Sequence, residues 1–375
     1  MRVLQVTGSS AGGVGRHVRQ VSELLAVSGH QVLLAGPADV VGPAAPPVRT
    51  AVVDITDRPR PQDALAVAEL RRLGAGADVV HAHGLRAGAL AAMAVRSVPR
   101  APRLVVTLHN MPVGGRGVRT VAAGLERVVA AGADVVLGVS GDIVSRMRER
   151  GAGTAARALV PAPVRQPAGT DPADVRASLD MAPEEPLVVT VARLAPQKGL
   201  DLLLDAAAIL AGPTTEARAG RHAGDSRGWR WVVLGEGPLR EQVEARVRAE
   251  DLPVRLAGHR DDAPDVLAAA DVVVSTATWE GQPLWLQEAL GVGAAIVATD
   301  VGGTAEVTGD AAVLVPGEAT ALAEAVRQVL ADPERQAGLR EAASARAPML
   351  PGPAEVLQQL EEIYRTSSAE SPGPA

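Results

Sequence analysis

The chain has 375 residues, which is the length of two domains of ordinary size. It carries 37 lysines and arginines against 43 aspartates and glutamates, a net charge of −6 with no run of basic residues, so nucleic acid is not expected as the main partner. Cysteine is absent, which excludes disulfides, thiolate metal sites and cysteine nucleophiles, and the scarcity of aromatic residues predicts cores of alanine, valine and leucine.

In the first half of the chain, short apolar runs alternate with longer segments of helical pattern. Near-continuous apolar strands separated by helices are typical of a parallel sheet that is covered on both faces. The expected strands cover 3–7, 31–35, 49–53, 79–83, 104–109 and 135–139, and the expected helices cover 14–28, 63–73, 119–131 and 142–150. A proline-rich segment, 160–172, then predicts a linker.

The second half repeats the same plan without repeating a motif. The expected strands cover 187–191, 231–234, 254–256, 272–275, 295–299 and 312–315, and the expected helices cover 200–210, 238–250, 262–270, 283–291, 320–331 and 354–365. We interpret 214–228 as a mobile surface loop. The pattern predicts two doubly wound α/β domains, at 1–165 and 172–345, followed by a helix at 350–366 and a disordered tail at 367–375.

The first candidate motif is a glycine loop that follows the first strand. It includes Gly12 and Gly13 and opens a helix, where glycines let backbone N–H groups approach an anion. The spacing does not match the G-x-G-x-x-G pattern of nicotinamide enzymes. This loop can be interpreted either as a phosphate-binding loop or as a plain tight turn, and both interpretations remain open.

The second candidate motif contains Arg193 and Lys198, just after the strand at 187–191. Lys198 is the only lysine in the chain, so this position has stayed lysine where every other basic side chain is arginine. A compact ammonium suits a point contact to phosphate, and a guanidinium offers a planar fork. We favour a functional role over that of a solvated surface lysine.

The third candidate motif surrounds the start of the helix at 283–291. Pro283 suits a first helical turn, which puts Glu280 in the preceding loop and Glu288 on the helix, one turn beyond Leu284. Carboxylates accept hydrogen bonds from sugar or ribose hydroxyls. Free backbone N–H groups at a helix start donate hydrogen bonds to phosphate oxygens. A capped amphipathic helix with two solvated glutamates is the alternative.

Histidines gather at expected strand ends. His81 and His83 share a strand face, and His109 closes the next strand. Two histidines at this spacing could begin a metal site, but no third ligand stands out, so no metal is expected. His17, His30 and His222 are interpreted as ordinary, and so, with some reserve, is His259.

Together these segments resemble the retaining glycosyltransferases of family 4, which have the GT-B fold: two Rossmann-like domains facing a central cleft. The resemblance spans nearly the whole chain and is densest from Leu187 to Val315. The residues that carry it are Gly12-Gly13, His109, Arg193, Lys198-Gly199, Gly235-Glu236-Gly237-Pro238-Leu239, Gly258, Asp271, the Glu280 and Glu288 pair, and Asp300-Val301-Gly302-Gly303 with Glu306.

The resemblance implies a hexosyltransferase (EC 2.4) that moves a sugar from a nucleoside-diphosphate sugar to a hydroxyl acceptor without a metal or cofactor. It implies catalytic roles for His109 beside the sugar, for Arg193 and Lys198 on the diphosphate, and for Glu280 on the transferred sugar. The first domain would take the acceptor, with the last helix packing back on it, and the second would bind the donor. The implied donor-binding residues are Gly12, Gly13, Gly235, Gly258, His259, Gly281, Gln282, Pro283, Leu284 and Glu288.

Two other functions remain open: a nucleotide-sugar epimerase with the same two-domain plan, and a non-catalytic protein that binds a nucleotide sugar. No stretch reaches the ~18 apolar residues of a membrane span, and Gln5 interrupts the N-terminal run, so no secretion signal is predicted. We expect a cytoplasmic protein. Attachment to the inner membrane face through Arg116, Arg119 and Arg127 is the less favoured interpretation of what is more often a solvated helix face.

Overall fold

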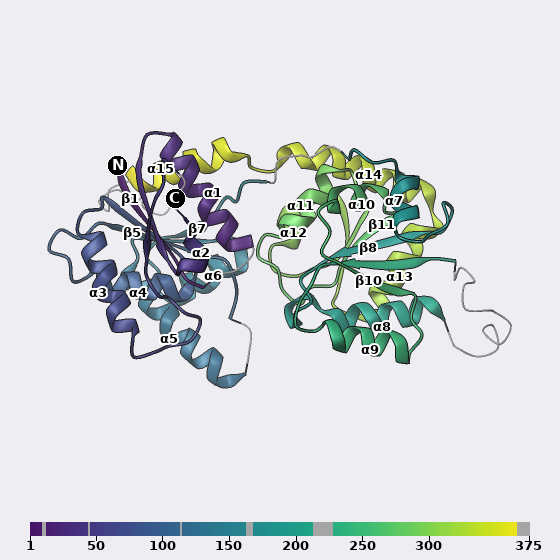
Figure 1. Ribbon diagram of the computed structural model, residues 1–375, viewed down its shortest axis with the longest axis horizontal. Coiled ribbons are helices and arrows are strands. Elements are labelled where there is room, and N and C mark those ends of the chain that lie inside the picture. Colours follow the sequence, from purple (N-terminus) through teal and green to yellow (C-terminus); the bar gives the residue numbers. More distant parts are fainter. Residues whose placement is uncertain (10–12, 44–45, 113–114, 163–167, 213–227, 366–375) are drawn as a thin grey trace. The chain divides into compact units, whose positions relative to one another are not determined.

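The computed structural model describes residues 1–9, 13–43, 46–112, 115–162, 168–212 and 228–365 (Figure 1). They form two units. Unit 1 comprises Met1–Pro161 and Pro351–Ala375, and unit 2 comprises Ala162–Leu350. Gly12, the tail at 367–375 and all but the last residue of the expected loop at 214–228 lie outside the described residues.

Unit 1 is built on a seven-stranded parallel sheet in the order β3-β2-β1-β4-β5-β6-β7. The order reverses beside β1, so β1, β4 and β5 are neighbours in the middle of the sheet. The strands are β1 (Arg2–Thr7), β2 (Gln31–Gly36), β3 (Arg49–Val52), β4 (Val79–His83), β5 (Arg103–Leu108), β6 (Val135–Gly138) and β7 (Ala155–Arg157).

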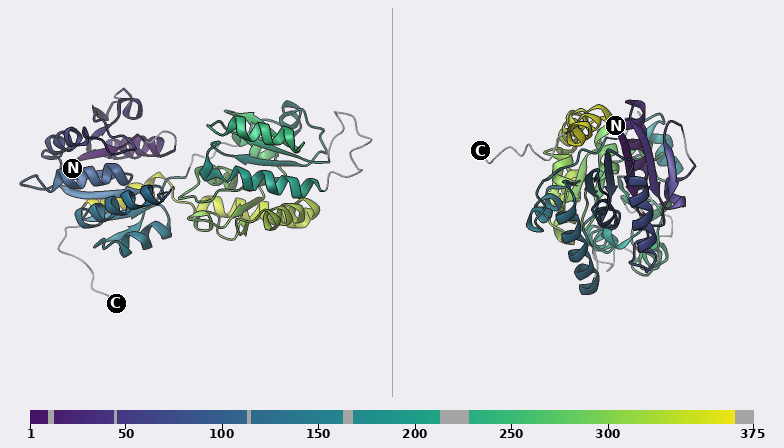
Figure 2. Two further views of the ribbon diagram at one scale, coloured as in Figure 1. Left: turned by 90° about the horizontal axis from the view of Figure 1, so that it is seen from below. Right: turned by 90° about the vertical axis from the view of Figure 1, so that its left-hand side faces the viewer.

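Helices flank both faces of this sheet (Figure 2). They are α1 (Gly13–Val27), α2 (Ala38–Val41), α3 (Asp63–Gly74), α4 (Leu85–Val95), α5 (Arg116–Gly132), α6 (Gly141–Glu149) and α15 (Pro353–Arg365). The last of these, α15, packs against α1 at the opposite end of the sequence (Figure 1). Its Tyr364 is buried, and Gln359 at its centre donates from Nε2 to the Arg157 carbonyl at 2.9 Å.

Unit 2 contains a six-stranded parallel sheet in the order β10-β9-β8-β11-β12-β13. Its strands are β8 (Leu187–Val191), β9 (Arg230–Leu234), β10 (Val254–Gly258), β11 (Val272–Ser275), β12 (Ile296–Thr299) and β13 (Ala312–Val315). Its helices are α7 (Pro172–Ser178), the 3-10 turn η1 (Pro196–Lys198), α8 (Leu200–Ala211), α9 (Arg240–Ala249), α10 (Ala263–Ala269), α11 (Leu284–Gly291), α12 (Thr304–Thr308), α13 (Ala319–Ala331), α14 (Pro333–Arg346) and the 3-10 turn η2 (Ala347–Met349).

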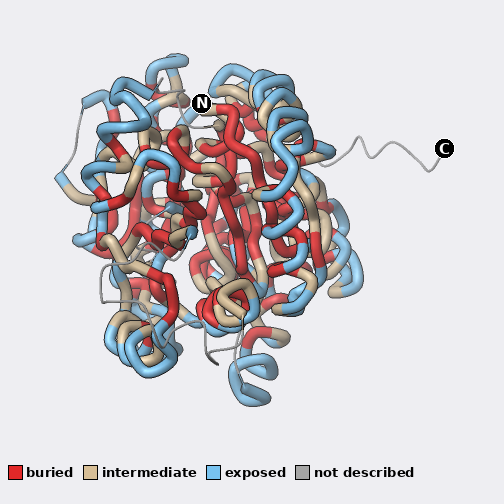
Figure 3. Tube along the Cα trace, turned by 90° about the vertical axis from the view of Figure 1, so that its right-hand side faces the viewer, coloured by how far each residue is buried: buried red, intermediate tan, exposed pale blue. Residues whose placement is uncertain are grey.

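The strands of unit 2 are buried on both faces, as a doubly wound sheet requires. Val188 and its neighbour Val189 are fully buried but belong to two separate apolar clusters, one on each side of the sheet. The largest buried side chain, Trp231, donates from Nε1 to Thr190 Oγ1 at 3.0 Å, which satisfies its only polar atom. Figure 3 shows the buried strands within and the exposed helix turns outside.

The structure confirms the expected fold class of two Rossmann-like, doubly wound parallel domains. Among the elements that the structure describes, the helices α2, α4, α7, α12 and α14, the edge strand β7 and the 3-10 turns η1 and η2 were not predicted. In α4 nearly every residue is buried, so its alanine-rich sequence has no polar face to reveal a helical period. In α14 the reverse holds, since only Ala343 is buried. No helix within the described ranges has both the length and the apolar character needed to cross a membrane.

Candidate functional site

In unit 2, the lysine and the first glutamate of the sequence motifs meet directly. Lys198 ends η1, which follows β8, and Glu280 lies in the loop after β11, the neighbouring strand. The Lys198 ammonium forms an ion pair with Glu280 Oε1, although 82 residues separate them. The Glu280 side chain is only 8% exposed and that of Lys198 20%, so the carboxylate is a nearly buried charge with a basic partner.

The two loops are also joined through their backbones. The Thr278 N–H donates to the Gln197 carbonyl at 2.9 Å, and Gln197 Nε2 donates to the Trp279 carbonyl at 3.0 Å. Between these contacts lies Gly199, in the left-handed region at φ +61°, where a Cβ would stand 1.9 Å from the Thr276 carbonyl oxygen. Only glycine fits this close approach, so Gly199 allows the turn that carries Lys198 to reach Glu280.

Arg193 lies in the segment between β8 and η1, which Gly235 and Gly258 help to hold in place. At Gly235, with φ +131°, a Cβ would stand 2.1 Å from the Ala192 carbonyl oxygen, and the Gly235 N–H donates to the Gly258 carbonyl at 2.7 Å. The Leu194 N–H donates to the Glu236 carbonyl at 2.9 Å. The Arg193 side chain is exposed and has no acidic partner among the residues that the structure describes.

The start of α11 follows Glu280 immediately. Pro283 is the N-cap rather than the first helical residue, and Gly281, Gln282 and Leu284 surround the positive end of the helix. The Gly303 N–H donates to the Glu280 carbonyl at 2.9 Å, which fixes the loop. Glu288 is half-buried in the middle of α11.

The remaining candidates are more scattered. His259 follows β10 and is largely exposed, with Nδ1 3.8 Å from Asp261 Oδ1. In unit 1, Gly13 begins α1 and is exposed, and His109 follows β5. The structure thus groups Lys198, Glu280 and the α11 start, places Arg193 with Gly235 and Gly258 beside them, and leaves His259 outside these contacts.

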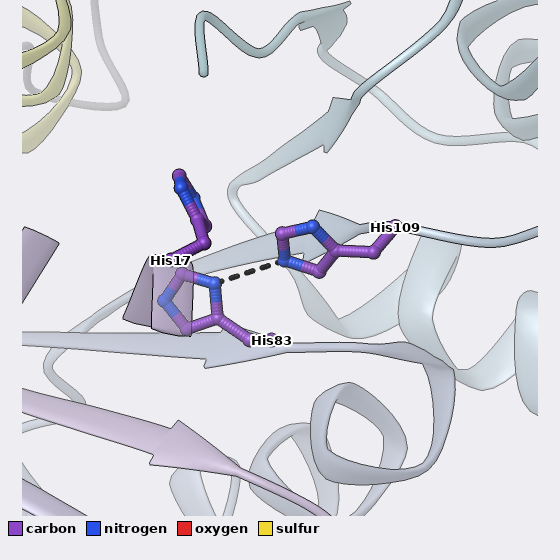
Figure 4. A group of neighbouring side chains, drawn as sticks. All are labelled: His17, His83 and His109. Atoms are coloured by element: carbon purple, nitrogen blue, oxygen red, sulfur yellow. Dashed lines mark hydrogen bonds between the residues drawn. The ribbon is translucent and has the colours of Figure 1, made fainter. Parts of the chain in front are cut away.

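Unit 1 carries a separate cluster of buried histidines at the ends of its central strands (Figure 4). His83 Nδ1 lies 3.2 Å from His109 Nε2, and His17, on the first turns of α1, completes a group in which one ring nitrogen from each residue lies within 4.8 Å of the others. The His17 and His109 ring centroids are 5.3 Å apart. His17 was interpreted as ordinary, and the structure places it beside His83 and His109 because α1 begins just after β1, which neighbours β4.

Hydrogen bonds extend this cluster into the core. His83 Nε2 contacts Gln5 Oε1 at 2.7 Å, Gln5 Nε2 donates to the Tyr364 hydroxyl at 3.2 Å, and that hydroxyl lies 2.6 Å from His81 Nδ1. Burial lowers the pKa of His17 to about 4 and that of His81 to about 3, and it holds the pKa values of His83 and His109 well below the usual range. These imidazoles are therefore neutral at pH 7.

Comparison with known sequences gives two family matches that follow one another along the chain. The family described as Glycosyl transferase 4-like domain matches residues 12–163, and the family described as Glycosyl transferases group 1 matches residues 185–332. The first falls in unit 1. The second falls in unit 2 and includes the Lys198 and Glu280 loops.

Among characterised proteins, an alpha-D-kanosaminyltransferase of Streptomyces kanamyceticus is 29% identical over 48% of this chain and 46% of its own length. A GDP-mannose-dependent alpha-(1-6)-phosphatidylinositol dimannoside mannosyltransferase of Mycobacterium tuberculosis is 31% identical over 41% and 38%. The chain therefore matches less than half the length of these relatives. Among solved structures, the Anabaena protein HepE in complex with UDP-glucose superposes with a TM-score of 0.76 at 21% identity, over 96% of this chain and 98% of that one, and shares the GT-B fold.

Proposed function

The chain belongs to the glycosyl transferases group 1 family, and from that premise we propose that it is a retaining hexosyltransferase using a nucleoside-diphosphate sugar as donor. The observation that carries the proposal is the meeting of Lys198 and Glu280 at the carboxyl ends of two neighbouring strands. Ligands of doubly wound sheets bind at this edge. The donor is assigned to unit 2 and the acceptor to unit 1.

The pairing of Lys198 with Glu280 suits both of them to a donor. An ammonium has three N–H donors, so Lys198 can keep its bond to Glu280 and still donate to a phosphate oxygen. Glu280 is nearly buried beside this cation, and its carboxylate oxygens can accept hydrogen bonds from sugar hydroxyls. Glu280 thereby orients the cation and holds the sugar.

The exposed Arg193 and the amides at the start of α11 supply the other diphosphate contacts. Negative charge builds on the leaving diphosphate as the glycosidic bond breaks, and prearranged donors stabilise that charge in the transition state. Each such donor is worth ~3 kcal/mol, or 10²–10³ in rate. These groups are fixed in the fold and need no metal at the diphosphate. Gly12 and Gly13 are proposed as further diphosphate contacts from unit 1.

The remaining roles follow from the same assignment. Glu288 accepts hydrogen bonds from the ribose hydroxyls, with Gly235, Gly258 and His259 beside the nucleotide. His109 contacts the transferred sugar near the reacting carbon. The acceptor hydroxyl attacks from the face that the diphosphate leaves, the new glycosidic bond forms as the old one breaks, and the acceptor proton passes to a leaving phosphate oxygen. This course retains the anomeric configuration.

The test is a donor screen followed by product analysis. UDP-glucose and GDP-mannose, the donors named for the solved and characterised relatives, are each added to the full chain, and thermal unfolding shows which one stabilises it. The stabilising donor is then incubated with a panel of hydroxyl acceptors, and the anomeric proton of the product is read by NMR. We expect acceptor-dependent release of nucleoside diphosphate and a product with the donor's configuration.

Each other outcome favours a different function. A donor converted to its epimer without an acceptor indicates an epimerase. A donor that stabilises the chain but stays intact with every acceptor, even over long incubation, indicates a binding protein. An inverted product would reject the proposed course of the reaction while leaving the donor assignment standing.

A further inference from the structure

A series of hydrogen bonds links the last helix of unit 1 to His109, and we call its members Tyr364, Gln5, His83 and His109 the Tyr364–His109 network. The Tyr364 hydroxyl, on α15, lies 3.2 Å from Gln5 Nε2 on β1. Gln5 Oε1 lies 2.7 Å from His83 Nε2, and His83 Nδ1 lies 3.2 Å from His109 Nε2 (Figure 4). The four side chains are at most 9% exposed, so their polar atoms depend on one another for hydrogen bonds.

The distances fix the direction in which the protons of this network point. The Tyr364 hydroxyl lies 2.6 Å from His81 Nδ1, which is short for an N–H donor and typical of an O–H donor. Tyr364 therefore donates its single proton to His81 and accepts a bond from Gln5 Nε2. Gln5 then turns its Oε1, an acceptor, toward His83. His83 consequently carries its proton on Nε2 and its lone pair on Nδ1.

His109 is the last member of the network, and its tautomer follows from the members before it. Because His83 Nδ1 can only accept, His109 Nε2 carries the proton and donates it. The lone pair of the neutral His109 ring is then on Nδ1. This nitrogen has no hydrogen-bond partner among the described residues, and it points away from His83 in Figure 4.

We propose that Tyr364, Gln5 and His83 are positioning residues that hold His109 in this tautomer, so that Nδ1 presents a lone pair to the transferred sugar. The inference rests on the proposed function, which puts His109 beside the reacting carbon. Positive charge develops at that carbon as the glycosidic bond breaks. A lone pair stabilises this charge and accepts a hydrogen bond from a sugar hydroxyl, whereas an N–H would point a partial positive charge at it. The effect is on the transition state, so kcat should depend on the network more than KM does.

The alternative is a network that only stabilises the core of unit 1. His109 would then exchange between its two tautomers. Loss of a network member would lower the stability of the fold, but it would change neither the position of the His109 proton nor kcat.

The first experiment determines the tautomers directly. The histidine rings of the full chain are labelled with ¹⁵N, and long-range ¹H–¹⁵N correlation spectra at pH 7 show which ring nitrogen carries the proton. Single substitutions of His83 and His109 assign the signals. We expect the Nε2–H tautomer alone for both residues. A His109 ring that is protonated on Nδ1, or that averages between its two nitrogens, overturns the proposal.

A matched pair of variants at His83 tests whether its acceptor is the cause. In His83→Asn the amide oxygen takes the place of Nδ1 and can still accept from His109, whereas His83→Leu has a similar size and no acceptor. We expect His109 to keep its tautomer in His83→Asn and to average between tautomers in His83→Leu. In His83→Leu, kcat should fall by roughly 3–10-fold, the value of one neutral hydrogen bond, with little change in the KM of the donor.

Tyr364→Phe tests the far end of the network. Without the hydroxyl, Gln5 is free to present either end of its amide to His83, so the His109 signals should again move toward the average of the two tautomers. Thr190→Val is the control because it removes an equally buried hydroxyl from unit 2, and it should leave the His109 signals unchanged. Circular dichroism and urea unfolding identify the variants that are folded. If His83→Leu is not, Tyr364→Phe is used for the kinetic comparison as well.

The proposal is overturned if a folded His83→Leu or Tyr364→Phe keeps the His109 tautomer of the native chain, or if its kcat equals that of the native chain. The spectra need no substrate, so they test the network separately from the transfer of sugar. A negative result in the spectra leaves the proposed transferase function standing. If the chain transfers no sugar, the role of the network toward the sugar is rejected, whatever the spectra show of the tautomers.

Discussion

The two units carry similar sheets but opposite chemistry at the carboxyl ends of their central strands. In unit 2, this edge holds an ion pair, an exposed guanidinium and loops that only glycine can form, at Gly199 and Gly235. In unit 1, it holds neutral, buried imidazoles joined through Gln5 and Tyr364 to the core. The same architecture thus supports a charged, partly exposed edge and an uncharged, buried one.

The two edges are held in place in different ways. In unit 2, backbone hydrogen bonds between carbonyls and amides of neighbouring loops hold the edge in place, which leaves side chains such as Arg193 available to a ligand. In unit 1 the side chains position one another, so a change in one is passed on to the others. Substitutions in the two units can therefore test this contrast.

Replacing Lys198 by alanine should lower turnover by roughly 10²–10³, because it removes a cation that stabilises the leaving diphosphate. It also leaves Glu280 nearly buried without its partner, which should lower the urea midpoint. Steady-state kinetics with the donor found by the screen measures the first effect, and denaturation measures the second.

The double variant Lys198→Ala/Glu280→Gln separates these two effects. It should regain much of the lost stability while remaining at least as slow, since the orphaned charge is gone but the cation and the carboxylate proposed to hold the sugar are both missing. Arg119→Ala, on an exposed face of α5, is the control and should match the native chain. Turnover near normal in Lys198→Ala would refute the assigned role of this lysine.

A pair of glycine substitutions compares the two units directly. Gly199→Ala should cost roughly 2–5 kcal/mol, from left-handed strain and from the clash of its Cβ with the Thr276 carbonyl. Gly151→Ala in unit 1, at φ +89° with nothing within 4 Å of the added Cβ, should cost only the roughly 1–2 kcal/mol of strain. Urea unfolding monitors both variants. Equal losses would show that the close approach at Gly199 does not constrain the loop.

Two buried hydroxyls offer a smaller test. Tyr364→Phe leaves Gln5 Nε2 and His81 Nδ1 without a partner, and Thr190→Val does the same to Trp231 Nε1 and the Val274 carbonyl. Each should cost roughly 1–3 kcal/mol in urea unfolding. Native-like stability of Tyr364→Phe would show that this hydroxyl does not stabilise the contacts of Gln5 and His81.

The smallest effect is expected for Arg193→Lys. The charge is kept and only the planar, two-pronged contact to phosphate is lost, so the change should be about tenfold in kcat/KM, or ~1.4 kcal/mol. A loss as large as that of Lys198→Ala would mean that the geometry of the guanidinium, and not its charge, dominates at this position.

The core strands could be predicted from the sequence because they are short apolar runs between helices; β4, β8, β11 and β13 each end where the pattern ends. The pattern fails where burial is complete or nearly absent. α4 is apolar on all sides and α14 polar on nearly all, so neither shows an amphipathic period. β7 has three residues, too few for any alternation to be recognised.

The candidate site divides in the same way. Lys198 and Glu280 were recognisable one at a time, because each lies in a motif that is local in sequence. Their ion pair was not, since it depends on β8 and β11 being adjacent. The neighbours of His17 could not be predicted for a related reason, because a lone histidine on a helix carries no signal until the strand order brings it beside His83 and His109.

The position of α15 has a consequence for how the protein is made. Unit 1 is complete only when the segment from Pro353 to Arg365 has been added, yet the rest of that unit ends at Pro161. At ~5–20 residues per second, the ribosome needs on the order of 10–40 s to cover the intervening stretch. During that interval the sheet of unit 1 lacks α15, and Gln5 and His81 lack their partner Tyr364. Unit 2 is contiguous in sequence, so it can finish folding before unit 1 does.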